Sequence, residues 1–329
     1  FAAAKADFEK GYAEKTILKV GRRMNYEKPG FSSLFRKTAR RVKRMEPPYK
    51  EAFIKADKGW GKVETWQYLK REAGAFTISY YLAALDLSYG PSGDISPKSD
   101  EKAIYLTLFW RTLKLSTLIT VLCLLLAYPI SYLLSTLPVK TSNLLLILVL
   151  LPFWTSLLVR TTAWIALLQQ EGVINDLLVG VGLIADDNRL AMIHNATGTV
   201  VAMTHILLPF MVLPLYSVMK TIPPSYMRAA KNLGATPTVA FIRVYLPNTV
   251  SGVGAGAILV FIISIGYYIT PALVGGVDGT LISNFIAYHM SSSLNWGLAA
   301  ALGVILLILV LVLYYLYDKI VGIDNMKLG

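Results

Sequence analysis

The residue types that usually do chemistry are scattered along this chain. The three histidines, His194, His205 and His289, lie far apart, and no His, Cys or carboxylate cluster has the spacing of a metal site. The Gly-Trp-Gly-Lys run at 59–62 is too short for a phosphate-binding loop, and there is no nucleophile elbow. Cys123 lies in an apolar run, as a small buried hydrophobe would. The sequence therefore predicts no catalysis and no cofactor or metal bound by this chain.

Charged and aromatic residues could still recognise a partner or a solute, and membrane helices must position them. Hydrophobic residues make up 55% of the 329 residues, above the usual level of about 45–50%. A bilayer core needs about 20 apolar residues in a helix. Five segments qualify: 115–134, 141–159 (continuing past Arg160 to 168), 196–219, 249–277 and 297–317. Prolines inside them, among them Pro129, Pro152, Pro209 and Pro214, favour a bundle, because neighbouring helices must cover the freed carbonyls. The predicted fold is an all-α polytopic membrane protein.

The basic residues give the bundle an orientation. The net charge is +12, but so apolar a chain would be insoluble as a free nucleic-acid binder, so no nucleic-acid partner is expected. Lys and Arg gather in the 220–248 loop, in the 135–142 turn and after the last span, while 278–296 has none. By the positive-inside rule these basic segments, and the C-terminus, face the cytoplasm.

Five spans with the C-terminus inside place residues 1–105 outside. We therefore expect a sixth span before Phe1, an extracytoplasmic region at 1–105, and a membrane domain at 106–329. The first region should be mostly helical, with a small core that includes Trp60 and Trp66. Apolar residues between Phe31 and Met45 have helical spacing among basic ones; a packed helix with a solvated basic face is favoured over a membrane-surface helix.

The 220–248 loop is the most informative segment. Ser225 could cap a helix start, and Gly234 could end that helix in a left-handed conformation. Thr236 would then cap a second helix with Pro237 at its first position. The second helix would carry an apolar side made of Val239, Phe241, Ile242, Tyr245 and Leu246. The expected product is two short helices joined by a sharp turn below the membrane.

This loop resembles the cytoplasmic motif of ABC importer permeases. The family motif is Glu-Ala-Ala, three residues, Gly, nine residues, then Ile-x-Leu-Pro. Here Ala229-Ala230 is followed by Gly234 and Val244-Tyr245-Leu246-Pro247 at the same spacing; the competing interpretation is an ordinary amphipathic interfacial loop. The resemblance implies a loop that docks into the ATPase. The implied docking residues are Arg228, Ala229, Ala230, Gly234, Leu246 and Pro247.

Arg228 stands where the family motif has Glu, so the charge is reversed. Three interpretations stay open. The ATPase of this system could carry an acid there, the docking could rely on Gly234 and the apolar face, or the subunit could be weakly coupled.

Other segments resemble spermidine/putrescine-type permeases, including 123–129, 151–160, 207–216 and 266–276. The resemblance covers about 105–329. It implies a multi-pass subunit of the bacterial inner membrane, with ABC ATPase subunits that carry ATP and Mg, a second permease chain that differs from this one, and a periplasmic or extracytoplasmic solute-binding protein.

A translocation path is harder to assign. Aromatic faces can hold an ammonium group, although such rings are more often packing or interfacial residues. Arg160 would repel a polycation, so a structural or snorkelling role is favoured. The candidate path residues are Trp154, Thr155, Tyr267, Tyr268 and Thr270.

Two other classes compete with an ATP-driven importer. A self-contained secondary transporter usually shows inverted repeats, and none is visible. A membrane-anchored interaction protein would not need five kinked spans. Copurification of an ATPase subunit would separate the first class from the other two.

Overall fold

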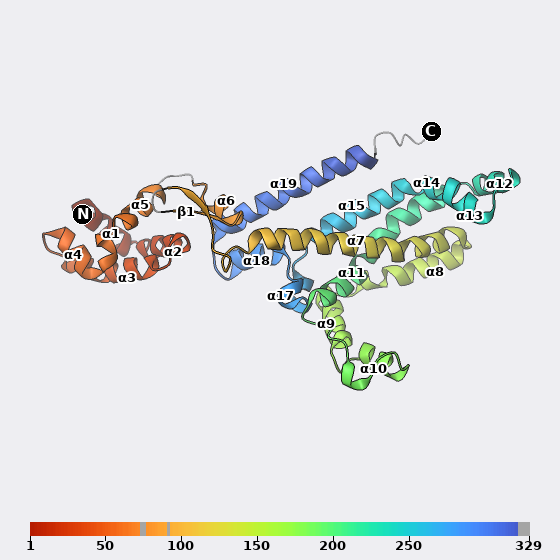
Figure 1. Ribbon diagram of the computed structural model, residues 1–329, viewed down its shortest axis with the longest axis horizontal. Helices are drawn as coiled ribbons and strands as arrows, with labels where there is room; N and C mark the ends of the chain where they lie inside the picture. Colours follow the sequence, from red (N-terminus) through yellow and green to blue (C-terminus); the bar gives the residue numbers. More distant parts are fainter. Residues whose placement is uncertain (73–76, 91–92, 322–329) are drawn as a thin grey trace. The chain divides into compact units, whose positions relative to one another are not determined.

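The computed structural model describes residues 1–72, 77–90 and 93–321, which are mainly helical (Figure 1). The described strands are β1 (Leu87–Tyr89) and β2 (Ile95–Pro97), an antiparallel pair in which Leu87 lies opposite Pro97. The chain divides into two compact units. The first contains Phe1–Leu106 and Tyr288–Leu302, and the second contains Thr107–Ala287 and the chain from Gly303.

The first unit is built from short helices around aromatic side chains. Phe8, Phe35, Phe53 and Trp60 are buried and pack mostly edge to face, with ring centroids 5.1–5.8 Å apart. Its helical segments before β1 are α1 (Ala2–Ala13), α2 (Ile17–Glu27), α3 (Phe31–Arg41), the 3₁₀ turn Val42–Arg44, α4 (Tyr49–Ala56), the 3₁₀ turn Lys58–Gly61, α5 (Val63–Glu72) and α6 (Ser79–Ala84).

Helix α3 decides between a membrane-surface helix and a packed helix with a solvated basic face, the two interpretations of residues 31–45. Its apolar stripe, which includes Phe31, Leu34 and Phe35, is buried in the aromatic core. Its basic residues, among them Arg36 and Arg40, are exposed. The packed helix with a solvated basic face is confirmed, because the side that would enter a membrane surface is already covered.

The second unit is a bundle arranged around α11. Among the described helices, three are long and apolar enough to cross a membrane, and two bent pairs raise the possible number to five. Helix α11 is the most enclosed, with 67% of its most apolar window buried, against 28% for α7 and 22% for α19. The end of α18 and the start of α19 belong to the first unit. The helices from Tyr105 onward are α7 (Tyr105–Thr136), α8 (Val139–Leu150), α9 (Leu157–Leu168), α10 (Val173–Gly180), α11 (Ala196–Thr221), α12 (Pro224–Asn232), α13 (Pro237–Ala240), α14 (Leu246–Asn248), α15 (Val250–Gly266), α16 (Ile269–Val274), α17 (Gly276–Gly279), α18 (Ile282–Ser291) and α19 (Trp296–Val321).

Two of the predicted spans are not straight helices. The segment 141–168 is broken at a 3₁₀ turn, Leu151–Trp154. The chain before the break, Val139–Trp154, and the chain after it, Leu157–Gly180, differ in direction by 96°. Pro152 cannot donate to the helix ladder, and Ser156 then caps a new helix by accepting from the Val159 amide at 3.2 Å. In the segment 249–277 the long helix ends at Gly266, because the backbone of Tyr267 is extended.

Glycines allow α11 and α15 to approach closely. A Cβ on Gly252 would lie 3.2 Å from the Leu215 Cα, and one on Gly256 would lie 2.6 Å from the Met211 sulfur. The alternating glycines of α15 therefore serve packing, as small residues do at membrane helix interfaces. Around this contact lies a core made mostly of Leu, Met, Val and Ile side chains.

Candidate functional site

The first half of the 220–248 loop is helix α12 and a tight end. Helix α12 begins at Pro224, with Pro223 extended before it and without a side-chain cap. The expectation that Ser225 caps the helix is wrong, because the two prolines set the cap and the start two residues earlier. Gly234 has φ +91, as predicted. Its amide donates to Lys231 O, and the Ala235 amide donates to Ala230 O, each at 3.0 Å, which is a Schellman ending.

The second half is not one regular helix. Thr236 caps it as predicted, with its hydroxyl accepting from the Val239 amide at 3.4 Å, and Pro237 opens α13. A turn of π-helix, Phe241–Tyr245, then leads into α14. The π turn rotates the apolar residues apart, so the predicted single apolar side is wrong. Phe241 and Tyr245 pack inward, while Ile242 is 54% exposed.

An aromatic cluster joins this loop to α7. Tyr132 packs edge to face on Phe241 and on Tyr245, with ring centroids 5.6 Å and 5.2 Å away. Tyr128 lies 6.3 Å from Phe241, and its hydroxyl is 3.1 Å from the Thr249 hydroxyl. The sequence analysis missed this cluster, although both pairs, 128/132 and 241/245, have the i,i+4 spacing that places aromatics on one helix face. The loop is therefore attached rigidly to a membrane helix.

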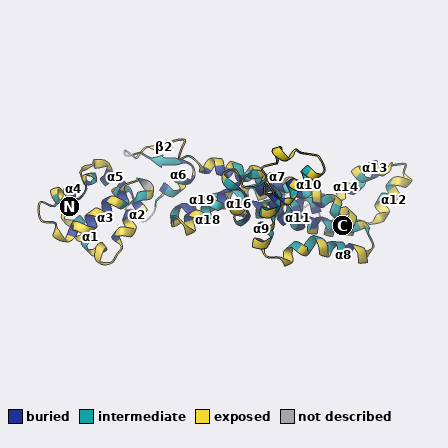
Figure 2. Ribbon diagram, turned by 90° about the horizontal axis from the view of Figure 1, so that it is seen from below, coloured by how far each residue is buried: buried dark blue, intermediate teal, exposed yellow. Residues whose placement is uncertain are grey.

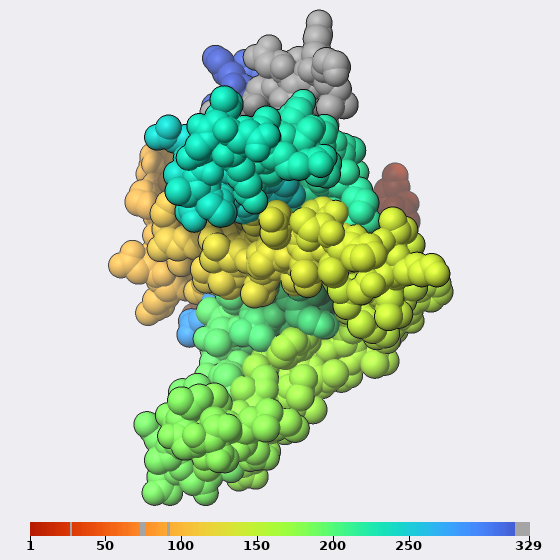
Figure 3. All heavy atoms as spheres, turned by 90° about the vertical axis from the view of Figure 1, so that its right-hand side faces the viewer, coloured from red at the N-terminus to blue at the C-terminus, as the bar shows by residue number. Residues whose placement is uncertain are grey.

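The outer side of the loop is uncovered. Arg228, Ala229, Gly234 and Pro247 are exposed, Leu246 is 39% exposed, and Ala230 is half-buried. Figure 3 shows this loop (teal) facing the viewer, and Figure 2 shows α12 largely as exposed. The predicted docking residues thus lie on one projecting segment, which is an arrangement suited to contact another protein.

The structure brings together only some of the candidate path residues. Thr270 is buried, and its hydroxyl lies 3.3 Å from the Thr161 hydroxyl of α9. Tyr267 packs partly against the core. Trp154 is 86% exposed at the break between α8 and α9, Thr155 is also exposed, and Tyr268 is 46% exposed. The path assignment stays a prediction, with Tyr267 and Thr270 as the pair inside the bundle.

A second polar group inside the bundle was not predicted. The Trp164 indole donates to His205 Nδ1 at 3.1 Å across α9 and α11. Trp can only donate, so His205 Nδ1 must be unprotonated. Arg160 lies one turn before Trp164, and its buried Nε has no hydrogen-bond partner among the described residues.

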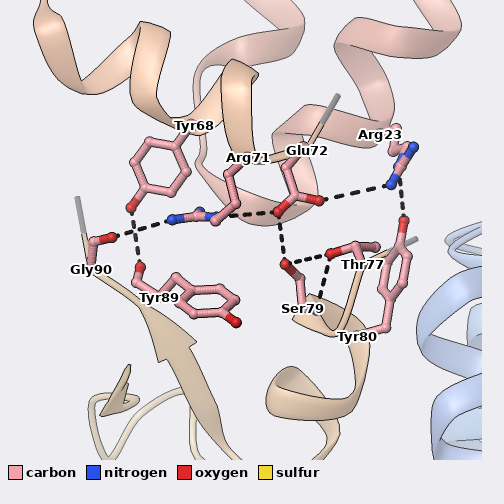
Figure 4. Close-up of polar contacts among 9 residues, drawn as sticks. All are labelled: Arg23, Tyr68, Arg71, Glu72, Thr77, Ser79, Tyr80, Tyr89 and Gly90. Atoms are coloured by element: carbon pink, nitrogen blue, oxygen red, sulfur yellow. Dashed lines mark hydrogen bonds and ion pairs between the residues drawn. The ribbon is translucent and has the colours of Figure 1, made fainter. Parts of the chain in front are cut away.

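The first unit holds a buried carboxylate, Glu72, in a polar cluster (Figure 4). Its side chain is 1% exposed. It accepts from the Ser79 hydroxyl at 2.7 Å and from Arg71 Nε at 3.3 Å. Arg71 lies over the rings of Tyr68 and Tyr89, 4.5 Å and 4.6 Å from their centroids. The cluster ties α5 to α6 and to β1, which indicates a structural role.

Membrane helices that carry a rigid, projecting loop are the architecture of a transport permease. The chain belongs to the family described as binding-protein-dependent transport system inner membrane component, whose profile matches residues 124–321.

The spermidine/putrescine transport system permease PotB of Haemophilus influenzae is 33% identical over 224 residues, which cover 68% of this chain and 78% of that protein. PotB of Escherichia coli is 32% identical over 68% of this chain and 81% of its own length. In a crystal structure of a bacterial ABC transporter involved in alginate import, one chain superimposes with a TM-score of 0.55 at 16% identity, covering 90% of this chain and 99% of that one.

These comparisons and the helical bundle make the chain a multi-pass inner-membrane protein and the transmembrane subunit of an ABC importer. The relatives are transport permeases, consistent with a subunit that is not itself catalytic. Such a subunit works with ATPase subunits, a second permease and a binding protein.

Proposed function

We propose that this permease imports polyamines such as spermidine or putrescine. The similarity to the PotB permeases, 32–33% over about two thirds of the chain, carries the proposal. In this proposal a binding protein delivers the solute at the extracytoplasmic face. The permease pair, formed with a different second chain, then opens alternately to either side.

Tyr267 and Thr270 are the favoured contacts for the solute. They lie where α15 ends and α16 begins, so backbone groups are free from the helix ladder at this point. In transporters, broken helices with such groups line a path inside the bundle. The ring of Tyr267 could face an ammonium group of the solute. Trp154, Thr155 and Tyr268 would contribute only at the mouths of the path, since they are exposed.

The 220–248 loop would couple this movement to ATP, which the ATPase subunits hold with Mg. The loop and the C-terminus would face the cytoplasm, and residues 1–105 the opposite side. Two features support a lever: the Schellman ending at Gly234 fixes the tip, and the cluster of Tyr132, Phe241 and Tyr245 fixes the base. A rigid segment transmits a displacement that a flexible loop would absorb.

The test is ATP hydrolysis by the purified complex in lipid vesicles, with its binding protein, with and without spermidine or putrescine. Stimulation by polyamine is the expected result. If an ATPase copurifies but does not respond to polyamine, the protein is still an importer subunit, but the proposal that its solute is a polyamine is wrong. A Tyr267→Ala variant should lower solute-stimulated hydrolysis without changing the basal rate, which separates path contacts from coupling.

A further inference from the structure

The end of α12 carries cations without counter-charges. No Asp or Glu occurs between residues 188 and 277. Within the described part of the chain, the side chains of Arg228, Lys231 and Arg243 have no hydrogen bond or ion pair, and all three are exposed. Arg228 and Lys231 are three residues apart, so they lie on one side of the helix. This surface attracts negative charge from outside the chain.

An exposed leucine lies beside these cations. Leu233 is 90% exposed, more than any other large apolar residue described. The hydrogen bonds at Gly234 and Ala235 hold it at the tip of the loop. A solvent-exposed apolar side chain held among cations is complementary to a pocket that is apolar at its base and lined with acidic residues at its edge.

A membrane surface fits this shape poorly. Every residue of α12 is exposed except Met227 and Ala230, which are half-buried. The helix therefore projects with most of its circumference free. A flat headgroup layer would cover one side of such a helix and leave the rest in water, whereas a cleft in a protein would cover it on several sides.

We propose that the ATPase subunit receives α12 in a cleft that is apolar where Leu233 enters and carries carboxylates opposite Arg228 and Lys231. This inference rests on the proposed coupling role and adds the chemistry of the partner. Arg228 is the specificity-determining residue, because its planar guanidinium can bind a carboxylate through two parallel hydrogen bonds. An ATPase with a basic cleft would be rejected by this permease.

The experiment measures how much ATPase remains bound to tagged permease pairs purified without solute, so it does not depend on the solute. Arg228→Glu should lower retention about tenfold, and Arg228→Lys should lower it less. Lys140→Glu is the matched control: Lys140 is exposed at the start of α8 and gives the same change in net charge. It should retain the ATPase as the unmodified chain does.

Compensation then tests the acidic cleft directly. A photo-crosslinker at Ala229 identifies the facing segment of the ATPase, and each Asp or Glu in it is changed to Arg. One such change should restore retention to the Arg228→Glu permease. Equal losses in Arg228→Glu and Lys140→Glu would indicate a headgroup or net-charge effect and overturn the proposal, as would normal retention in both or no compensating change. If Arg228→Glu fails to pair with the second permease, Arg228→Gln provides the comparison.

Discussion

The two compact units bury different side chains. In the first, four aromatic residues form the centre, and charged residues on the surface pair with one another, as Lys37 does with Asp57 at 2.9 Å. In the second, the centre consists mostly of Leu, Met, Val and Ile side chains, while many leucines, such as Leu125 at 64%, lie exposed on the outside. Within the described residues, ion pairs of the second unit are confined to Arg189 with Asp176 and Asp186, outside the long helices.

This contrast follows from the solvent around each unit. In water, burying rings gains free energy, and charges remain outside. In lipid the outside is already apolar, so close approach and internal hydrogen bonds hold helices together. The Ser131 hydroxyl of α7 accordingly donates to Val212 O of α11 at 3.2 Å. The first unit should therefore be sensitive to lost volume, and the second to added volume.

The largest effect is expected from removing a ring in the first unit. Trp60 is 2% exposed, and its indole donates to the Thr38 hydroxyl at 2.8 Å. Trp60→Ala should cost about 3–5 kcal/mol, from lost transfer energy and the cavity left behind. Hydrogen exchange should rise across residues 1–72 and stay unchanged in α11. Equal protection of 1–72 in the variant would contradict an aromatic core that stabilises this unit.

Added volume should damage the second unit instead. Gly256→Val places atoms against the Met211 sulfur and backbone, where a Cβ alone lies 2.6 Å from the sulfur. We expect a cost of about 1–3 kcal/mol from overpacking. The measurement is the yield of monodisperse permease in detergent, with Gly303→Val as the control, since nothing lies within 4 Å of a Cβ there. Equal yields would mean that α11 and α15 separate easily.

A change at the loop tip should alter coupling more than stability. Gly234 has φ +91, and a Cβ there meets nothing within 4 Å. Gly234→Val therefore adds backbone strain of about 1–2 kcal/mol without a clash, which should move the tip away from its partner. Solute uptake should fall while folding and insertion persist. Gly180→Val, also in open space but without a positive φ, should transport normally; normal uptake in both variants would remove the tip from the coupling mechanism.

Local signals in the sequence predicted local structure well. The Gly234 ending, the Thr236 cap and the apolar segments depend on residues near one another in the chain; the ending and the cap are present, and three of the five predicted spans are unbroken helices. The break at Pro152 and the start at Pro224 were missed, because apolar content and a nearby Ser were given more weight than the backbone limits of proline. The contact of Tyr132 with Phe241 and the burial of Glu72 depend on packing between distant segments, and no single-sequence signal fixes such pairs.

The smallest effect concerns a surface ion pair of the first unit. Burial of the Asp57 carboxyl acts to raise its pKa, but the hydrogen bonds from Lys37 and the Gly59 amide outweigh this and hold the pKa below its usual value. A carboxyl with a lowered pKa stabilises the fold above its unfolded pKa of about 4 and loses that contribution as the pH falls through the lower folded value.

Asp57→Ala should therefore cost about 1 kcal/mol or less at neutral pH and less still in acid, measured by hydrogen exchange in residues 31–61. Glu64→Ala removes an ion pair with Lys28 whose carboxylate is more exposed, 50% against 20% for Asp57, and should change nothing measurable. Asp57 also accepts a hydrogen bond from the Gly59 amide, and Glu64 makes no such cap. If the two variants lost equal stability, the cap would contribute nothing beyond the ion pair.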